Sequence, residues 1–348
     1  MVGAINDITL DPYTAANVNE DRFSSRGPTD DGRVKPDVVA NGNMLFSSFG
    51  QSDTAYGSLR GTSMAAPNVT GTAALLIQHY QNLFDAAPRS ATTKGLLIHT
   101  ATDAGNVGPD YSFGWGVVNA EAAANFLTNS NNSNSQSFLT ERTYTGSEQV
   151  ISVESDGTNP LKVSLVWTDP AGTPQRAGLD VNTPVLVNDL DIRVVDPNGV
   201  THYPWTLDPA NPNNPAVKTT SNSIDNVEQV LIDTPIAGKY EIRINHKGDV
   251  SRQDYSLLSS GTQFIRYIFT GVYQGGRGWG SSRGATSISF GDVDGDGTDE
   301  IGVTRDDGGN SRYYVLDYNP STGGFVDLLN DQGGRGWGSS RGATSISF

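Results

Sequence analysis

The first 127 residues alternate short apolar runs with longer segments of helical periodicity. Val2–Ile5 and Val38–Ala40 are short and apolar, and turn residues set off the second, which predicts two strands. Met64–Phe84, Thr92–Thr100 and Asn119–Leu127 carry apolar residues at helical spacing, which predicts three helices. Strands mixed with helices in this way predict an α/β domain with a parallel sheet.

The helix predicted at Met64–Phe84 is rich in small side chains. Ala or Gly stands at positions 65, 66, 71, 73 and 74, beside the apolar run 75–77. Small residues allow a neighbouring backbone to approach closely, and a helix that is apolar around much of its circumference is typical of a domain interior. We therefore expect this helix to be buried.

The pattern changes after a polar linker at residues 128–136, which has no apolar periodicity. Leu161–Trp167, Leu190–Val195 and Tyr240–Ile244 alternate apolar and polar residues and are separated by turns such as Pro197–Gly199. Short alternating strands of this kind predict an antiparallel β-sandwich or jelly roll over residues 137–262.

The last segment, residues 268–348, contains an internal repeat. Gln274–Phe290 and Gln332–Phe348 are the same 17 residues, offset by 58 positions. Repeats of this size predict stacked units such as propeller blades. One blade cannot bury its own faces, so we expect a partial β-propeller-like region that is truncated at the C-terminus.

Composition narrows the class of protein further. The chain has 348 residues, which suits two or three domains, and its net charge of −15 disfavours nucleic acid as a partner because phosphates are repelled. The absence of Cys excludes disulfides, thiolate zinc sites and a cysteine nucleophile. No apolar run approaches the roughly 18 residues of a membrane span, so we expect no membrane insertion. No signal peptide follows Met1.

One segment carries the elements of nucleophilic catalysis. Gly61–Pro67 reads Gly-Thr-Ser-Met-Ala-Ala-Pro and opens the long helix. Thr62 is expected to cap the helix, which places Ser63 in the first turn, where its backbone N–H has no intrahelical partner. That N–H, at the positive end of the helix, suits a tetrahedral oxyanion, and Gly61 leaves room for a substrate backbone. The same Gly-Thr-Ser step is also common as a simple helix cap.

Three blocks in order give this segment a wider context. Phe23–Pro28 with Lys35–Val38 precedes the serine, and Gly114–Ala120 follows it. Together with Gly61–Pro67, these blocks resemble the subtilisin-like serine peptidases over residues 1 to about 127. The resemblance implies the C-terminal part of that family's catalytic domain, with Ser63 as the nucleophile of a serine endopeptidase that forms an acyl-enzyme. Asn68 departs from the family, because many members have His directly after the proline.

The partners of Ser63 are not found by sequence order. In this family Asp, His and an oxyanion-hole Asn precede the serine, but the four histidines here, at positions 79, 99, 202 and 246, all follow it. We therefore expect a fragment that lacks its base and is inactive alone. An α/β-hydrolase order, with His99 as base, is the alternative; Ala65 stands where that motif has Gly.

Two groups of oxygen donors predict structural Ca²⁺. The loop from Asp292 to Glu300 repeats the ligand spacing of a calcium loop, with Asp292, Asp294, Asp296, Thr298 and Glu300 as ligands, and resembles FG-GAP or VCBS-type repeats. Residues 138–260 resemble the jelly-roll domain that follows the catalytic domain in larger bacterial subtilisins, with matching blocks between Leu161 and Ile244. In that region Asn188, Asp189 and Asp191 form a second candidate calcium cluster. A polar sheet edge or loop without a metal explains these three residues equally well.

These observations predict an extracellular enzyme that acts on protein or peptide substrates. Secretion follows from the family resemblance, the calcium loop and the acidic surface. The competing hypothesis is a non-catalytic, calcium-binding adhesion or binding protein that retains a remnant of a protease. The oligomeric state has no signal in the sequence.

Overall fold

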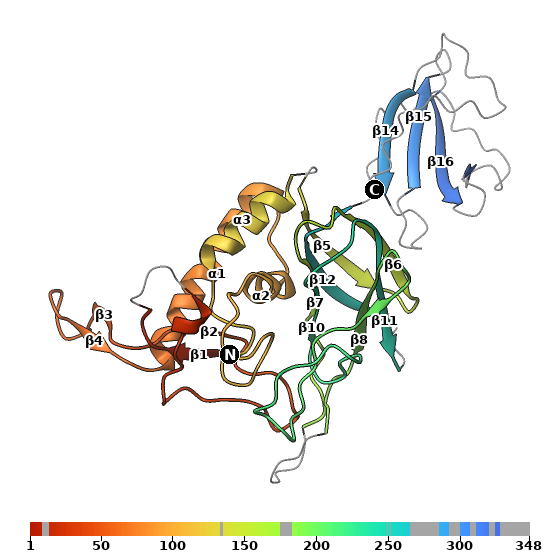
Figure 1. Ribbon diagram of the computed structural model, residues 1–348. Helices are drawn as coiled ribbons and strands as arrows, with labels where there is room; N and C mark the ends of the chain where they lie inside the picture. The colour runs from red at the N-terminus through yellow and green to blue at the C-terminus, as the bar shows by residue number, and fades with distance from the viewer. Residues whose placement is uncertain are drawn as a thin grey trace. The chain divides into compact units, whose positions relative to one another are not determined.

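The computed structural model describes residues 1–8, 14–132, 135–174, 183–248, 250 and 252–264, and the backbone of four strands between residues 285 and 327 (Figure 1). Residues 1–148 and 152–265 belong to one compact unit, and residues 149–151 and 266–348 to a second. Within the described residues, none of the helices has both the length and the apolar character needed to cross a membrane.

The N-terminal part of the first unit contains the predicted strands and helices. Strands β1 (Val2–Ile5) and β2 (Val38–Asn41) pair in parallel, and Val39 adds a parallel bridge to Val117. The helices are α1 (Thr62–Phe84), α2 (Ser90–His99) and α3 (Ala120–Ser130). A 3-10 turn, η1 (Ala15–Asn17), and a hairpin of β3 (Leu45–Ser48) and β4 (Tyr56–Leu59) complete this part.

Helix α1 is buried on one face only, which corrects the expectation of a buried helix. Ala65, Val69, Thr72, Leu76 and Tyr80 are buried at helical spacing and pack towards β1, β2 and α3. On the other face Leu75 is 68% exposed, and Ile77 is exposed as well. The small residues of α1 therefore lie on two faces of the helix, and the described residues cover only one of these faces.

Helix α3 also corrects the predicted linker at residues 128–136. The Asn119 side chain caps α3 by accepting a hydrogen bond of 2.9 Å from the Ala122 N–H. The helix continues through Ser130, because Thr128 and Ser130 satisfy their hydroxyl groups on the carbonyls of Ala124 and Leu127. Strand β5 begins at Ser137, so the connection is shorter than the polar composition indicated.

Residues 137–264 form two antiparallel sheets, which extend two residues beyond the predicted boundary. One has the order β10-β7-β12-β5 and the other β13-β6-β11-β8-β9. The strands are β5 (Ser137–Tyr144), β6 (Gln149–Ser155), β7 (Leu161–Trp167), β8 (Asp189–Val195), β9 (Thr201–His202), β10 (Val227–Ile232), β11 (Gly238–Lys247), β12 (Gln253–Ser260) and β13 (Gln263–Phe264). The jelly-roll topology predicted for this region stays a prediction. We call residues 137–264 the two-sheet region.

The helices and the two-sheet region share their hydrophobic core. Val166 of β7 and Val227 of β10 belong to the same buried cluster as Ala65 and Ile98, and Leu258 of β12 packs with Leu96. The approach is close at Gly95 of α2, where an added Cβ would lie 2.7 Å from Leu258 Cδ1. Figure 1 shows α2 beside β7 and β12.

Buried polar groups fix this packing in one register. The ring nitrogens of His99 lie 2.8 Å from Ser164 Oγ on β7 and 2.8 Å from Ser260 Oγ on β12. Thr92 Oγ1 lies 2.7 Å from Ser256 Oγ. Because an unpaired buried polar group costs free energy, these contacts require α2 and the sheet to meet in this alignment.

The second unit is described only by its strands. β14 (Ala285–Gly291), β15 (Glu300–Asp306), β16 (Ser311–Asn319) and β17 (Gly324–Asp327) form an antiparallel sheet in that order. The strand predicted after the acidic loop is confirmed as β15. The propeller-like arrangement stays a prediction, since the described strands of this unit form one four-stranded sheet and a propeller consists of several.

Asp225 offers a test of the shared packing. Its buried carboxylate accepts a 2.8 Å hydrogen bond from the Val34 N–H, 191 residues earlier in the chain. Asp225→Ala leaves that buried N–H without a partner and is expected to lower the free energy of unfolding by about 1–3 kcal/mol, measured by urea denaturation. The control Asp233→Ala, at an exposed position, is expected to have a small effect. Equal effects of the two changes would contradict this account.

His99 makes the stability of this interface depend on pH. Burial lowers the pKa of His99 well below its ordinary value of 6.5, and Lys162 lowers it further. The unfolded chain then takes up a proton that the folded chain refuses, so this stability is complete above about pH 6.5 and falls as the pH decreases, by up to about 1.4 kcal/mol per pH unit. In urea denaturation at pH 7.5, 6.5 and 5.5, we expect the free energy of unfolding of His99→Gln to rise relative to that of the wild type as the pH falls. A constant difference between the two proteins would refute the assignment.

Candidate functional site

Ser63 is an exposed residue in the first turn of α1. The N-cap of the helix is Gly61, with φ 148° and no side-chain cap, and Thr62 is already helical. The expectation that Thr62 caps the helix is therefore wrong. The N–H groups of Met64 and Ala65 both donate to the Gly61 carbonyl, at 2.9 and 3.4 Å. The Ser63 N–H comes before them, among the donors that a helix leaves without an intrahelical partner.

Gly42 positions the segment that leads into Ser63. Gly42 follows β2, its N–H donates to the Ile5 carbonyl, and its carbonyl accepts a 2.8 Å hydrogen bond from the Gly61 N–H. A Cβ at Gly42 would lie 2.6 Å from Ala4 Cβ and 2.9 Å from Gly61 O. Since β1, β2 and the start of α1 meet at this point, the sheet holds the first turn of α1 in place.

Apolar packing against β1 and β2 also holds the first turns of α1 in place. Ala65 and Val69 are buried against Ala4, Val38 and Ala40, while Ser63 stays at the surface. Pro67 is the only proline within α1 and has no N–H to donate to the Ser63 carbonyl. The arrangement presents a hydroxyl and a free backbone donor together on a rigid helix start, which is suited to nucleophilic attack with oxyanion stabilisation.

The histidines have their contacts elsewhere. His79 Nε2 lies 2.9 Å from Thr128 Oγ1, and His202 Nε2 lies 3.3 Å from Asp196 Oδ2. His246 packs edge-on against Tyr144, and His99 is held between Ser164 and Ser260. The alternative that makes His99 the base of Ser63 is therefore wrong, because both nitrogens of that buried ring are bonded within the shared core.

Asn68, the residue at which the segment departs from the subtilisin pattern, lies at the surface. It lines a cavity of about 440 Å³ together with Asn6, Asn41, Asn119 and Glu121. The polar lining comes from the ends of β1 and β2 and from the start of α3. The sequence carried no signal for this cavity, because its residues lie far apart in the chain.

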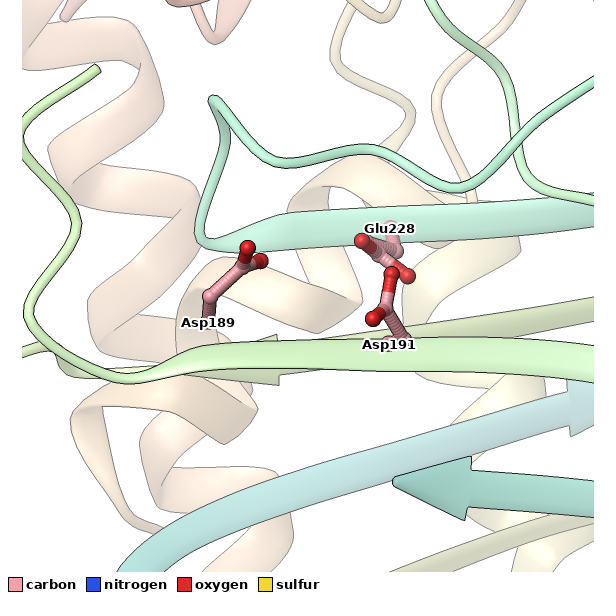
Figure 2. Close-up of side chains that lie close together, drawn as sticks. All are labelled: Asp189, Asp191 and Glu228. Atoms are coloured by element: carbon pink, nitrogen blue, oxygen red, sulfur yellow. The ribbon is translucent and has the colours of Figure 1, made fainter. Parts of the chain in front are cut away.

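The second predicted site is brought together in part. Asp189 and Asp191 of β8 lie with Glu228 of β10 (Figure 2), and one carboxylate oxygen from each of the three lies within 4.8 Å of the other two. Asn188 lies beside them in sequence, but its side-chain nitrogen donates a 2.6 Å hydrogen bond to Gln253 Oε1. We call Asp189, Asp191 and Glu228 the carboxylate cluster.

Sequence reasoning missed Glu228. It lies two residues before Val230 and four before Ile232, so it takes an inward position of an alternating strand and is fully buried. A charged residue at an inward position is the signal that identifies it. Its Oε2 accepts a 2.7 Å hydrogen bond from the Ile192 N–H at a point of β8 that β9 does not reach.

The electrostatics of the carboxylate cluster are unfavourable to three free carboxylates. Burial, with a smaller contribution from the neighbouring Asp191 carboxylate, raises the pKa of Asp189 to about 6, against the opposing effect of Lys247. Burial also raises the pKa of Glu228 well above its ordinary value, despite the hydrogen bond from Ile192. Lys247 Nζ lies 3.2 Å from Asp191 Oδ1, an ion pair without hydrogen-bond geometry, and 3.9 Å from Asp189 Oδ2.

The predicted loop at Asp292, Asp294, Asp296 and Thr298 lies outside the described residues. Glu300 begins β15, of which only the backbone is described. The calcium ligands assigned to this loop stay a prediction.

Comparison with known proteins finds similarity to a protease family in the N-terminal part. Residues 1–116 match the family model Peptidase_S8, the Subtilase family. The serine protease/ABC transporter B family protein tagA of Dictyostelium discoideum is 28% identical over 288 residues, which cover 70% of this chain and 16% of that protein. The C5a peptidase of Streptococcus pyogenes is 35% identical over 137 residues (36% and 12%), and subtilisin DY of Bacillus licheniformis is 36% identical over 109 residues (31% and 34%).

Among solved structures, fervidolysin from Fervidobacterium pennivorans, a keratinolytic enzyme related to subtilisin, is 21% identical with a TM-score of 0.29, covering 70% of this chain and 28% of that one. The family match and these curated relatives therefore show that the N-terminal part of this chain is similar to subtilase domains. The chain spans 12% to 34% of the length of the three curated relatives named above.

Gly42 tests how the nucleophile segment is positioned. Gly42→Ala places a methyl group against Ala4 and the Gly61 carbonyl, and we expect it to lower the free energy of unfolding by about 1–3 kcal/mol, measured by urea denaturation. The matched control is Gly71→Ala on the exposed part of α1, where an added Cβ meets nothing within 4 Å. That change is expected to be neutral or to stabilise by up to about 1 kcal/mol. A neutral Gly42→Ala would contradict the proposed close approach.

Proposed function

We propose that this chain is the nucleophile-bearing part of a subtilisin-like serine endopeptidase. The observation that carries the proposal is Ser63, exposed in the first turn of α1 and inside the segment that matches the subtilase family. The substrates are proteins or peptides. In the acyl-enzyme mechanism, Ser63 Oγ attacks the scissile carbonyl, the amine leaves, and water then hydrolyses the ester.

The helix start supports two parts of this chemistry. The Ser63 N–H supplies one of the two donors of the oxyanion hole, at the positive end of α1. Gly61 and Thr62 line the approach of the substrate backbone, since Gly61 carries no side chain and Thr62 belongs to the first turn. The oxyanion donor and the approach of the substrate both come from described residues, and neither depends on the general base.

The base and its orienting acid come from outside the described site. A general base must lie within about 3.2 Å of the hydroxyl it deprotonates, and the four histidines have their contacts elsewhere. In our proposal the catalytic Asp, His and oxyanion-hole Asn belong to the segment that the family carries before the serine. The chain by itself is then inactive.

Exposed apolar side chains support the same proposal. Leu75 and Ile77 on α1, and Phe46 and Tyr56 on the β3–β4 hairpin, are exposed, and the two aromatic rings stack with centroids 5.8 Å apart. Exposed apolar groups of this size mark surfaces that another part of a protein covers. In our proposal the remainder of the peptidase domain covers them, and the chain expressed alone tends to aggregate.

The two-sheet region has a structural role in this proposal. Its core and hydrogen bonds are continuous with α2, which supports a region that stabilises the peptidase fold. The enzyme is proposed to be extracellular, where millimolar calcium fills weak sites such as the one predicted at residues 292–300. The competing function, a non-catalytic calcium-binding protein, shares this region but makes no use of Ser63.

Covalent labelling tests the assignment of Ser63. The chain alone is expected to show no labelling by a fluorophosphonate above the Ser63→Ala background, because loss of the histidine lowers turnover by roughly 10⁶ in subtilisin. Labelling is read by mass spectrometry of the peptide that contains Ser63. Modification of Ser63 in the chain alone would contradict the proposed inactivity.

A second arm separates inactivity from the competing function. The same experiment on the chain preceded by the in-frame polypeptide encoded upstream of Met1 is expected to label Ser63, and Ser63→Ala abolishes the signal. If that polypeptide carries Asp, His and Asn blocks and Ser63 still stays unlabelled in a folded protein, the endopeptidase proposal fails and the non-catalytic function replaces it.

A further inference from the structure

Four buried oxygen atoms around the carboxylate cluster have no hydrogen-bond partner in the described residues. They are Asp189 Oδ1, Asp191 Oδ1, Glu228 Oε1 and Asn245 Oδ1. Glu228 is 0% exposed and Asp191 6%. Buried polar atoms in proteins are nearly always hydrogen-bonded, so four acceptors without a hydrogen bond at one place indicate a missing partner that carries positive charge.

The four oxygens come from three strands. Glu228 lies on β10 of one sheet, Asp189 and Asp191 on β8 of the other, and their carboxylates point towards one another (Figure 2). Asn245 on β11 is directly opposite Asp191 in the strand register, and residues that face each other in an antiparallel pair carry their side chains on the same side. The amide oxygen of Asn245 therefore joins the same group.

The geometry suits one hard cation. Calcium binds oxygen ligands at 2.3–2.6 Å, so two ligands of one ion lie no more than about 5 Å apart. Asp189, Asp191 and Glu228 meet this limit, since one carboxylate oxygen from each of them lies within 4.8 Å of the other two. The ligand set contains oxygen alone, which favours Ca²⁺ over the softer metals that prefer nitrogen and sulfur.

Lys247 is the cation that the chain itself supplies here, and it compensates only part of the negative charge of the cluster. Its ammonium group lies 3.2 Å from Asp191 Oδ1 and farther, at 3.9 Å, from Asp189 Oδ2. Its side chain is about half exposed. One charge faces three carboxylates, and Glu228 has no ion pair among the described residues. The flexible lysine stem is free to leave for solvent when a divalent ion enters.

We propose that Asp189, Asp191 and Glu228 bind a calcium ion, with Asn245 Oδ1 as a fourth ligand, and that the ion joins β8 of one sheet to β10 of the other. The ion replaces the repulsion between the three carboxylates by attraction to a common centre. It fixes the stretch of β8 that, among the described strands, pairs with none on the side of Glu228. The site is independent of the chemistry proposed for Ser63.

Hydrogen–deuterium exchange on the full chain tests this site by location, which separates it from the loop at residues 292–300. In 2 mM CaCl₂ compared with EDTA, peptides covering β8 and β10 are expected to exchange at least about tenfold more slowly, because the ion closes the contact between them. Glu228→Gln keeps the shape of the side chain but removes its charge, and is expected to abolish this protection. The matched control Glu241→Gln, at a part-exposed carboxylate of β11, is expected to retain it.

Lys247→Met provides a second variant that does not remove a ligand. Without the competing ammonium group, calcium is expected to bind about tenfold more tightly at this site, measured as the calcium concentration that gives half-maximal protection of β8. Melting in EDTA confirms that each variant is folded. The proposal is overturned if calcium gives the wild type no protection at β8 and β10. It is also overturned if folded Glu228→Gln retains that protection, or if Lys247→Met leaves the half-maximal concentration unchanged.

Discussion

Helix α2 contacts both halves of the first unit. The rest of that unit depends on the contacts that the two sides of this helix make. One side packs with α1 and α3, and the other lies on β7 and β12. The helix is short and carries polar side chains on the sheet side, so its burial is favourable only when Thr92 and His99 meet the serines of the strands. The apolar contact at Gly95 and these hydrogen bonds require the same alignment, which makes the packing specific.

The position of Ser63 follows from this packing through a short chain of contacts. The cluster that contains Val166 and Val227 of the two-sheet region also contains Ala65 and Val69, two and six residues beyond the serine. The other support is the hydrogen bond between Gly61 and Gly42 at the end of β2. The start of α1 is thus held by the parallel strands and, through the shared core, by residues that lie far along the chain.

The sequence predicted the elements that depend on local pattern. The three helices, the three strands predicted at residues 161–167, 190–195 and 240–244, and the strand after the acidic loop are confirmed. Features that depend on distant residues were missed. Thr62 has the composition of a cap, but the turn at Gly61 places it inside the helix, and α1 has an apolar composition on a face that the described residues leave exposed. Glu228 joins the predicted aspartates only because β10 lies next to β8.

The hydrogen bond between His99 and Ser260 spans 161 residues, and this separation has a consequence during synthesis. A ribosome adds about 5–20 residues per second, so Ser260 leaves it roughly 8 to 32 s after His99. During that interval α2 lacks the strands on which it lies, and Gly95 and Leu96 face water. The nascent N-terminal part therefore completes its core only after β12 has emerged, and the order of translation makes the last strands of the two-sheet region the final step in shaping the segment that carries Ser63.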